Sequence, residues 1–161
     1  MDFLGKKDFD RLVDWLNEYL ANYPCPDKAD VHVSIRDCSI SVSPLGKKNY
    51  KQFEDKFVEL NKDNCILKEN IEAIKAQFPD LVEKLDLAIG NATSFDIVPK
   101  GNSKSYCIQF LTEYSDIHFF GDKVFPGGND YEIFNDNRVQ SSYHVRDYHH
   151  TQEIIREKFM N

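Results

Sequence analysis

The sequence predicts an α/β protein in two parts, an antiparallel sheet covered by helices and then a shorter stretch of alternating helices and strands. Residues 1–98 run in the order helix, hairpin, two helices, hairpin, which favours an α+β layer with a four-stranded antiparallel sheet. From residue 103 onward, helix and strand alternate, which favours parallel pairing. Because a Pro-Lys-Gly-Asn segment at 99–102 separates the two patterns, we expect domains at 1–98 and 99–161.

Hydrophobic periodicity identifies the elements of the first part. Apolar residues at helical spacing predict three helices, at 8–23, 53–60 and 67–78, the last ending at Pro79. Alternation of apolar and polar residues predicts four strands, at 31–35, 38–42, 85–89 and 94–98. We expect a two-residue turn in the second hairpin.

The second part holds shorter elements. The expected helices are 106–111, 129–134 and 151–159, and the expected strands are 117–120 and 143–145. The strand at 117–120 is apolar on both faces, which is typical of a central parallel strand.

The composition of the chain limits the classes of molecule that it could bind. The chain has 161 residues, 41% of them hydrophobic, and a net charge of −7, which argues against nucleic acid and anionic membranes as partners. No transmembrane stretch is present in the sequence. The cysteines are widely spaced, so we expect reduced, mostly buried thiols in a cytoplasmic protein. They are Cys25, Cys38, Cys65 and Cys107.

The most informative run extends from Phe119 to Asp136. Gly121 allows a turn after the strand, Asp122 then projects from the strand's carboxyl end, and Asp130 follows the next turn. Two hard oxygen donors near one loop suit Mg²⁺. A turn followed by a helix that Asn129 or Asp130 caps explains the same spacing equally well.

This run also resembles a known family. Phe-Phe-Gly-Asp-Lys at 119–123, Pro-Gly-Gly-Asn-Asp at 126–130 and Glu-Ile-Phe at 132–134 are similar to the last conserved block of eukaryotic phosphomannomutases, which belong to the haloacid dehalogenase (HAD) superfamily. Further matches in the same order are Ile35-Arg36, Ser43-Pro44-Leu45-Gly46, Ser94-Phe95-Asp96, Pro99, Lys104 and Tyr106-Cys107.

The resemblance implies a fold and an activity. Residues 1–98 would be the cap domain, which binds substrate and forms the homodimer, and residues 99–161 would be the C-terminal part of a HAD-like Rossmannoid core. The family's reaction interconverts mannose 6-phosphate and mannose 1-phosphate for GDP-mannose synthesis, with Mg²⁺. A hexose phosphate is therefore the expected ligand.

The resemblance also implies roles for individual residues. Arg36, Lys47, Ser94 and Asp96 match substrate-binding positions, and Lys104 matches the phosphate-stabilising lysine. Asp122 matches a Mg²⁺ ligand of the family, for which the spacing above already gives Asp130 as a second donor, and Phe134 and Asp136 match a second cation site.

The sequence departs from the family at several of these positions. Lys47 and Glu54 stand where the family has arginines, so that Glu54 reverses a charge facing the distal phosphate. Asn137 and Val139 replace the usual Pro and Thr beside the second cation site.

The superfamily's nucleophile motif is the largest departure. Its enzymes begin with a strand that ends in Asp-x-Asp-Gly-Thr, whereas Asp8-Phe9-Asp10 opens a helix and no Gly-Thr follows. Aligned to the family, Met1 falls near the start of the cap, so we expect a phosphomannomutase that lacks its N-terminal core segment and is inactive alone. The alternatives are a non-catalytic sugar-phosphate-binding or dimerisation module, and one half of a split mutase.

Overall fold

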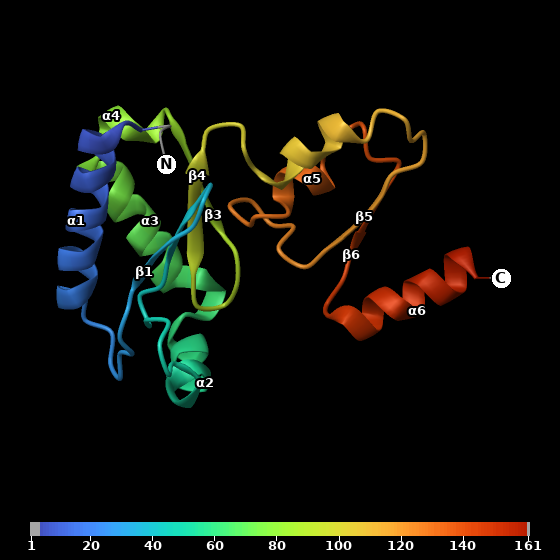
Figure 1. Ribbon diagram of the computed structural model, residues 1–161. Coiled ribbons are helices and arrows are strands. Elements are labelled where there is room, and N and C mark those ends of the chain that lie inside the picture. Colours follow the sequence, from blue (N-terminus) through green and yellow to red (C-terminus); the bar gives the residue numbers. More distant parts are fainter. Residues whose placement is uncertain (1–3, 161) are drawn as a thin grey trace. The chain divides into compact units, whose positions relative to one another are not determined.

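The computed structural model describes residues 4–160, and the chain divides into two compact units, Met1–Asn102 and Ser103–Asn161 (Figure 1). The elements of the first unit are α1 (Lys6–Asn22), β1 (Val33–Ile35), β2 (Ile40–Val42), α2 (Lys51–Leu60), η1 (Lys62–Asn64), α3 (Cys65–Gln77), α4 (Pro79–Val82), β3 (Leu85–Ile89) and β4 (Phe95–Pro99). This order confirms the predicted helices and strands of the first part.

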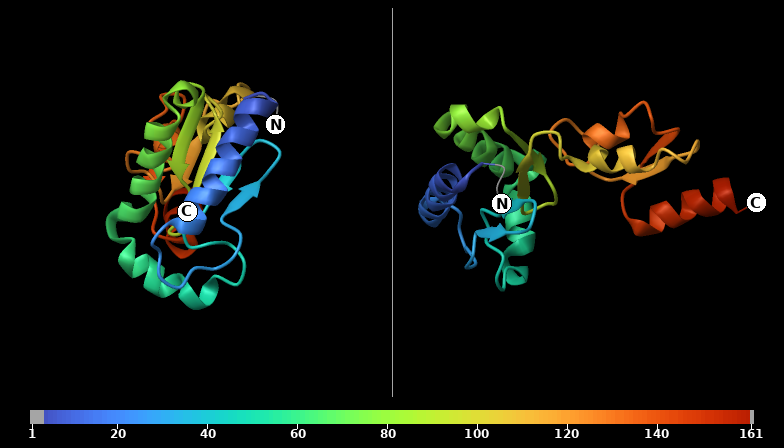
Figure 2. Two further views of the ribbon diagram at one scale, coloured as in Figure 1. Left: turned by 90° about the vertical axis from the view of Figure 1, so that its left-hand side faces the viewer. Right: turned by 45° about the horizontal axis from the view of Figure 1, so that its top comes forward.

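The first unit is built on a four-stranded antiparallel sheet with the strand order β1-β2-β4-β3. Side chains alternate between the two faces of a strand, and Ile40 lies opposite Ile97 while Val42 lies opposite Phe95. All four are fully buried and form the apolar face. Figures 1 and 2 show α1 and α3 side by side over one face of this sheet.

The helices supply the other half of this core. Leu12, Leu16 and Leu20 recur every fourth residue on α1 and are buried, as a single apolar stripe requires. Trp15 of α1 meets the ring of Phe78 edge-on, with centroids 5.4 Å apart, at the end of α3. The packing of these helices onto the apolar face therefore gives the first unit a core of its own.

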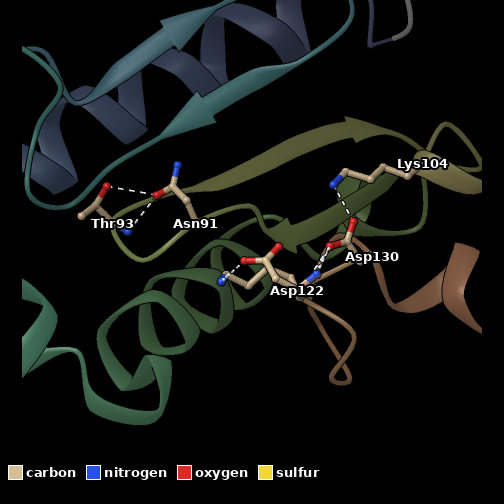
Figure 3. A network of polar contacts seen from close by, with 6 residues as sticks. Asn91, Thr93, Lys104, Asp122 and Asp130 are labelled. Atoms are coloured by element: carbon tan, nitrogen blue, oxygen red, sulfur yellow. Dashed lines mark hydrogen bonds and ion pairs between the residues drawn. The ribbon is translucent and has the colours of Figure 1, made fainter. Parts of the chain in front are cut away.

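One expectation about the second hairpin is wrong. The link between β3 and β4 is longer than two residues, because Asn91 forms a local turn in which its Oδ1 accepts the Thr93 N–H at 2.8 Å and the Thr93 hydroxyl at 3.1 Å (Figure 3). The Gly90 N–H donates to the Ser94 carbonyl at 3.1 Å and closes the loop.

The expectation of mostly buried thiols is also wrong, although all four cysteines are free. Cys25 is buried, whereas Cys38, Cys65 and Cys107 are exposed. Cys38 lies in the turn between β1 and β2, and Cys65 is the first residue of α3. Both positions lie at the ends of elements, where the chain runs along the surface.

The second unit contains η2 (Lys104–Phe110), β5 (His118–Gly121), α5 (Tyr131–Phe134), β6 (Ser141–His144) and α6 (Tyr148–Phe159). The predicted parallel pairing is confirmed, since β5 and β6 run parallel with Phe120 opposite Tyr143. The helix expected at 106–111 is a 3₁₀ helix rather than an α-helix. No helix of residues 4–160 is long and apolar enough to cross a membrane.

Candidate functional site

The sheet of the first unit has a polar face opposite its apolar face. Ser41 lies between Ser34 and Asp96 in a row of cross-strand neighbours. Ser43 and Ser94 follow and precede the paired strands two residues from Ser41 and Asp96, and the Ser43 hydroxyl donates to the Thr93 carbonyl at 2.8 Å. The structure therefore brings together Ser94 and Asp96, as expected from the sequence, and adds two serines.

Lys47 reaches into this polar face. Its Nζ donates a hydrogen bond of 2.6 Å to the Ser41 hydroxyl, and the side chain is half-buried. Burial lowers the pKa of Lys47, the positive charge of Arg36 lowers it further, and the carboxylate of Asp96 opposes both. Asp96 lies directly opposite Ser41 in the sheet, so its carboxylate and the Lys47 ammonium group share this part of the polar face.

One oxygen of this polar face, Asp96 Oδ1, accepts no hydrogen bond within the described part of the chain. This oxygen is also buried. Burying a polar atom without a partner is costly, so an acceptor in this state is suited to a ligand hydroxyl. Arg36 is exposed in the hairpin turn, where its backbone N–H donates to the Ser39 carbonyl at 2.8 Å.

Glu54 lies in the first turn of α2 and is partly exposed. The turn just before this helix carries Lys47 and Lys48. Negative charge in a first helical turn is favourable for the helix itself, so Glu54 has a local structural reason to be there. Whether it faces a bound phosphate stays a prediction.

The second unit assembles a different polar cluster around Asp130, which is 2% exposed. Its Oδ1 accepts from Lys104 Nζ at 2.5 Å, and its Oδ2 accepts from the backbone N–H groups of Asp122 and Lys123, both at 3.0 Å (Figure 3). A Cβ on Gly121 would lie 2.9 Å from Asp130 Oδ2, so only glycine allows the strand end to approach this carboxylate.

These contacts determine the state of Asp130. Burial favours protonation, but the hydrogen bonds from Lys104 and the two amides outweigh it, so the pKa of Asp130 is lowered. Asp130 occupies the N-cap position of α5 without a side-chain cap bond, so the expected capping role is wrong. The carboxylate is taken up by the strand end and by Lys104 instead.

Asp122 is the more accessible carboxylate of the pair. Its side chain is half-exposed and forms an ion pair with Lys123 Nζ at 2.6 Å. Within the described residues, no three His, Cys, Asp or Glu side chains come together as a metal site. The oxygens of Asp130 are already occupied by hydrogen-bond donors, and Asp122 alone supplies fewer oxygens than Mg²⁺ takes, so the Mg²⁺ role of Asp122 stays a prediction.

Of the two residues matched to the second cation site, Asp136 has its oxygens occupied by Arg138. Asp136 Oδ1 accepts from Arg138 N and Nε, both at 2.9 Å, and Oδ2 accepts from Nη2 at 2.6 Å. The guanidinium and this backbone N–H lower the pKa of Asp136 to about 2. The Arg138 guanidinium already neutralises the Asp136 carboxylate and occupies both of its oxygens, which a metal ion would need as ligands.

Comparison with known proteins places this chain in a family. The model of the family described as eukaryotic phosphomannomutase matches residues 1–161. This chain belongs to the eukaryotic phosphomannomutase family. Phosphomannomutase 1 of Dictyostelium discoideum is 35% identical over 159 residues, which are 98% of this chain and 63% of that protein. The phosphomannomutases of Saccharomyces cerevisiae and Arabidopsis thaliana are each 36% identical, over 86% and 81% of this chain and 55% and 52% of their own lengths.

The chain thus spans between half and two thirds of the length of these phosphomannomutases.

Sequence reasoning missed several partners of the family's motif residues. Register would have found Ser41, because it lies opposite Asp96. The contacts of Lys123 and Arg138 had no such signal, since ion pairs between sequence neighbours depend on local backbone geometry.

Proposed function

We propose that the 161-residue chain carries the hexose-phosphate-binding part of a phosphomannomutase and the C-terminal piece of its core. By itself it binds mannose 1-phosphate or mannose 6-phosphate through Arg36, Lys47, Ser94 and Asp96 without interconverting them. The sequence holds no Asp-x-Asp-Gly-Thr segment, and without a nucleophile no phosphoenzyme forms.

The position of Lys47 carries this proposal. A half-buried ammonium group on a row of serine and aspartate oxygens offers a phosphate group a fixed cation and offers the sugar hydroxyls several partners, and Arg36 is proposed as the second cation. A lysine holds phosphate as a point charge and lacks the planar fork of arginine, so the site has lower directional specificity than an arginine pair would have.

In the second unit we propose that Asp122 supplies one ligand to Mg²⁺, with the others outside the described residues. Bound there, the metal would neutralise charge on the transferred phosphoryl group. Lys104 Nζ is half-exposed beside Asp130, which holds its ammonium group in place for a phosphate oxygen. Phe134 and Asp136 are not proposed as ligands, because Arg138 neutralises Asp136.

We further propose a cytoplasmic homodimer that forms through the first unit and contributes to GDP-mannose synthesis. The first unit has a buried core and its own sheet, so we expect residues 1–98 to fold and dimerise independently. Sedimentation of this fragment measures the oligomeric state, and a monomer at all concentrations would contradict the proposal.

Calorimetry on the full chain tests the binding site. Lys47→Met removes the ammonium group and keeps most of the stem, and a lost charged hydrogen bond corresponds to roughly ten-fold or more weaker mannose 1-phosphate binding. Lys75→Met is the matched control, since Lys75 carries the same charge on α3 and pairs with Glu72. Equal affinity of Lys47→Met and wild type would refute the site.

A coupled mutase assay tests the chemistry. We expect the chain alone, with Mg²⁺ and a hexose bisphosphate activator, to stay at the no-enzyme rate. Adding a polypeptide that carries the Asp-x-Asp-Gly-Thr segment separates the alternatives, because restored turnover supports a split mutase and its absence supports a non-catalytic module. Turnover by the chain alone that Asp122→Ala abolishes would contradict the proposal.

A further inference from the structure

Val31 has a backbone conformation that its side chain disfavours. Its φ is 64°, in the left-handed region, which is a genuine outlier for a β-branched residue. The side chain is 53% exposed, so burial of the valine does not compensate for the unfavourable backbone. Such conformations persist only where surrounding contacts determine the backbone, and they gather at functional sites.

The surrounding contacts connect Val31 to Lys47. The Lys47 N–H donates to the Val31 carbonyl at 2.9 Å and to the Asp30 carbonyl at 3.1 Å, and the Lys48 N–H donates to the Asp30 carbonyl at 3.0 Å. The left-handed turn at Val31 thus allows two successive carbonyls to reach the backbone of Lys47. These hydrogen bonds to its N–H fix the backbone position of Lys47, the proposed phosphate-binding lysine.

Gly46 fixes the same segment from the other side. A Cβ on Gly46, whose φ is 94°, would lie 2.2 Å from the Ala29 carbonyl oxygen, so the two backbones touch directly. The Ser43 hydroxyl contacts the Gly46 carbonyl at 3.1 Å and the Thr93 carbonyl at 2.8 Å. One hydroxyl therefore lies between the segment before Lys47 and the loop before Ser94.

We propose that residues 29–31, Ser43 and Gly46 form a clamp that positions Lys47 against Ser41, with Val31 as the strained positioning residue. In taking Lys47 as the phosphate contact, this inference rests on the proposed function. The clamp fixes the backbone from which the flexible four-carbon stem of Lys47 extends, so fewer conformations of the stem compete with the one that places the ammonium group at Ser41.

The first test uses two substitutions at Val31. Val31→Gly keeps access to positive φ, whereas Val31→Pro fixes φ near −65° and cannot form the turn. The readout is the titration of the Lys47 Cε signal in carbon-13 NMR, identified by its loss in Lys47→Met. In wild type we expect its midpoint below the ordinary value of 10.5, because burial lowers the pKa of Lys47. Val31→Pro should raise this midpoint and weaken mannose 1-phosphate binding about ten-fold, and Val31→Gly should preserve both.

The second test uses matched glycines. Gly46→Ala drives a methyl group into the Ala29 carbonyl, whereas Gly5→Ala places an alanine at similar φ, 72°, with nothing within 4 Å. Gly46→Ala should release Lys47 and raise its midpoint, and Gly5→Ala should leave it unchanged. Ser43→Ala removes the hydroxyl that contacts the Gly46 and Thr93 carbonyls and leaves the backbone contacts of Gly46 in place, so it should shift the midpoint less, in the same direction. It decides the question if the harsher variants do not fold.

The outcomes separate this inference from the proposed function. If Val31→Pro, Gly46→Ala and Ser43→Ala fold and all retain the wild-type Lys47 titration, the clamp only packs the loop and the inference is overturned. If wild type shows no mannose 1-phosphate binding while the titrations shift as expected, the proposed function fails and the clamp stands.

Discussion

The two units differ in how much of their apolar surface they bury. The first unit buries leucines, isoleucines and phenylalanines from α1, α3 and three strands of its sheet. Among the described residues, the second unit buries only Ile108, Ile133 and Val145 as hydrophobic side chains, and it exposes large ones. The exposed ones are Tyr106, Phe110, Tyr114, Tyr131, Tyr148, Ile155, Phe159 and Met160.

The difference in buried apolar surface follows from the type of sheet, which is antiparallel in the first unit and parallel in the second. An antiparallel sheet can bury one face and leave the other polar, which four strands and two helices achieve in the first unit. A parallel sheet is normally covered on both faces, yet β5 and β6 form a sheet of only two strands. The second unit therefore positions its polar cluster by hydrogen bonds around Asp130 more than by a core.

The largest expected effect compares the same substitution in both units. Ile97→Ala, at a fully buried position of β4, should lower the free energy of unfolding of the first unit by about 3–5 kcal/mol, whereas Ile133→Ala should cost about 2 kcal/mol or less. Trp15, the only tryptophan, lies in the first unit and reports its urea transition by fluorescence. Ile133→Ala should leave that transition unchanged, and a shared shift would mean that the units unfold as one.

Hydrogen exchange sharpens the same comparison without mutation. Amides of β4, paired on both sides, should exchange at least about 100-fold more slowly than amides of β5, because local opening requires less energy where fewer apolar contacts are lost. Mass spectrometry of peptic fragments measures this. Strong protection of His118–Gly121 in a monomer would show that the second unit is self-sufficient.

The next effect concerns acid stability. The lowered pKa of Asp130 means that its ionised form stabilises the second unit above about pH 4, and this contribution is lost as the pH falls further. Asp130→Asn should remove this pH dependence and cost about 1–2 kcal/mol at pH 7, since Lys104 is half-exposed and solvent screens the pair. Circular dichroism between pH 2 and pH 7 measures it.

Asp116→Asn provides the control, because Asp116 is exposed in the same unit. It should keep the acid dependence of the wild-type chain. An Asp130→Asn variant that still loses structure with the wild-type midpoint would place the acid sensitivity elsewhere, with Asp136 as the first candidate, since its pKa is also lowered.

Sequence reasoning was most successful where one physical signal determines a feature. Helical spacing predicted α1, and alternation predicted the strands from Val33 to Val42. It failed where side chains compete for backbone groups. The second hairpin has a longer loop because the Asn91 side chain bonds to Thr93. Asp130 does not cap α5 with its side chain, because Lys104 and the backbone amide that follows Gly121 donate to its oxygens.

The polar face shows the same limit. Periodicity placed Ser94 and Asp96 on one face, but the left-handed turn at Val31 has no sequence signal, since valine is among the least expected residues there. The position of Lys47 depends on that turn and on Gly46, so it could only be found in three dimensions.

The smallest expected effect concerns Glu54 of the first unit, a negative charge at a position where the family has an arginine. If Glu54 faces the distal phosphate, Glu54→Arg exchanges repulsion for attraction, and near a protein surface such a change is worth about 1 kcal/mol, or about five-fold in affinity for mannose 1-phosphate. Glu54→Gln should give part of the gain. Glu59→Arg makes the same charge change at an exposed position of the same helix and should alter affinity little. Calorimetry at low and high salt measures the three variants, and because exposed charges are screened, the gain should shrink as salt rises. Unchanged or weaker binding by Glu54→Arg would place residue 54 outside the site and leave phosphate recognition to Arg36 and Lys47.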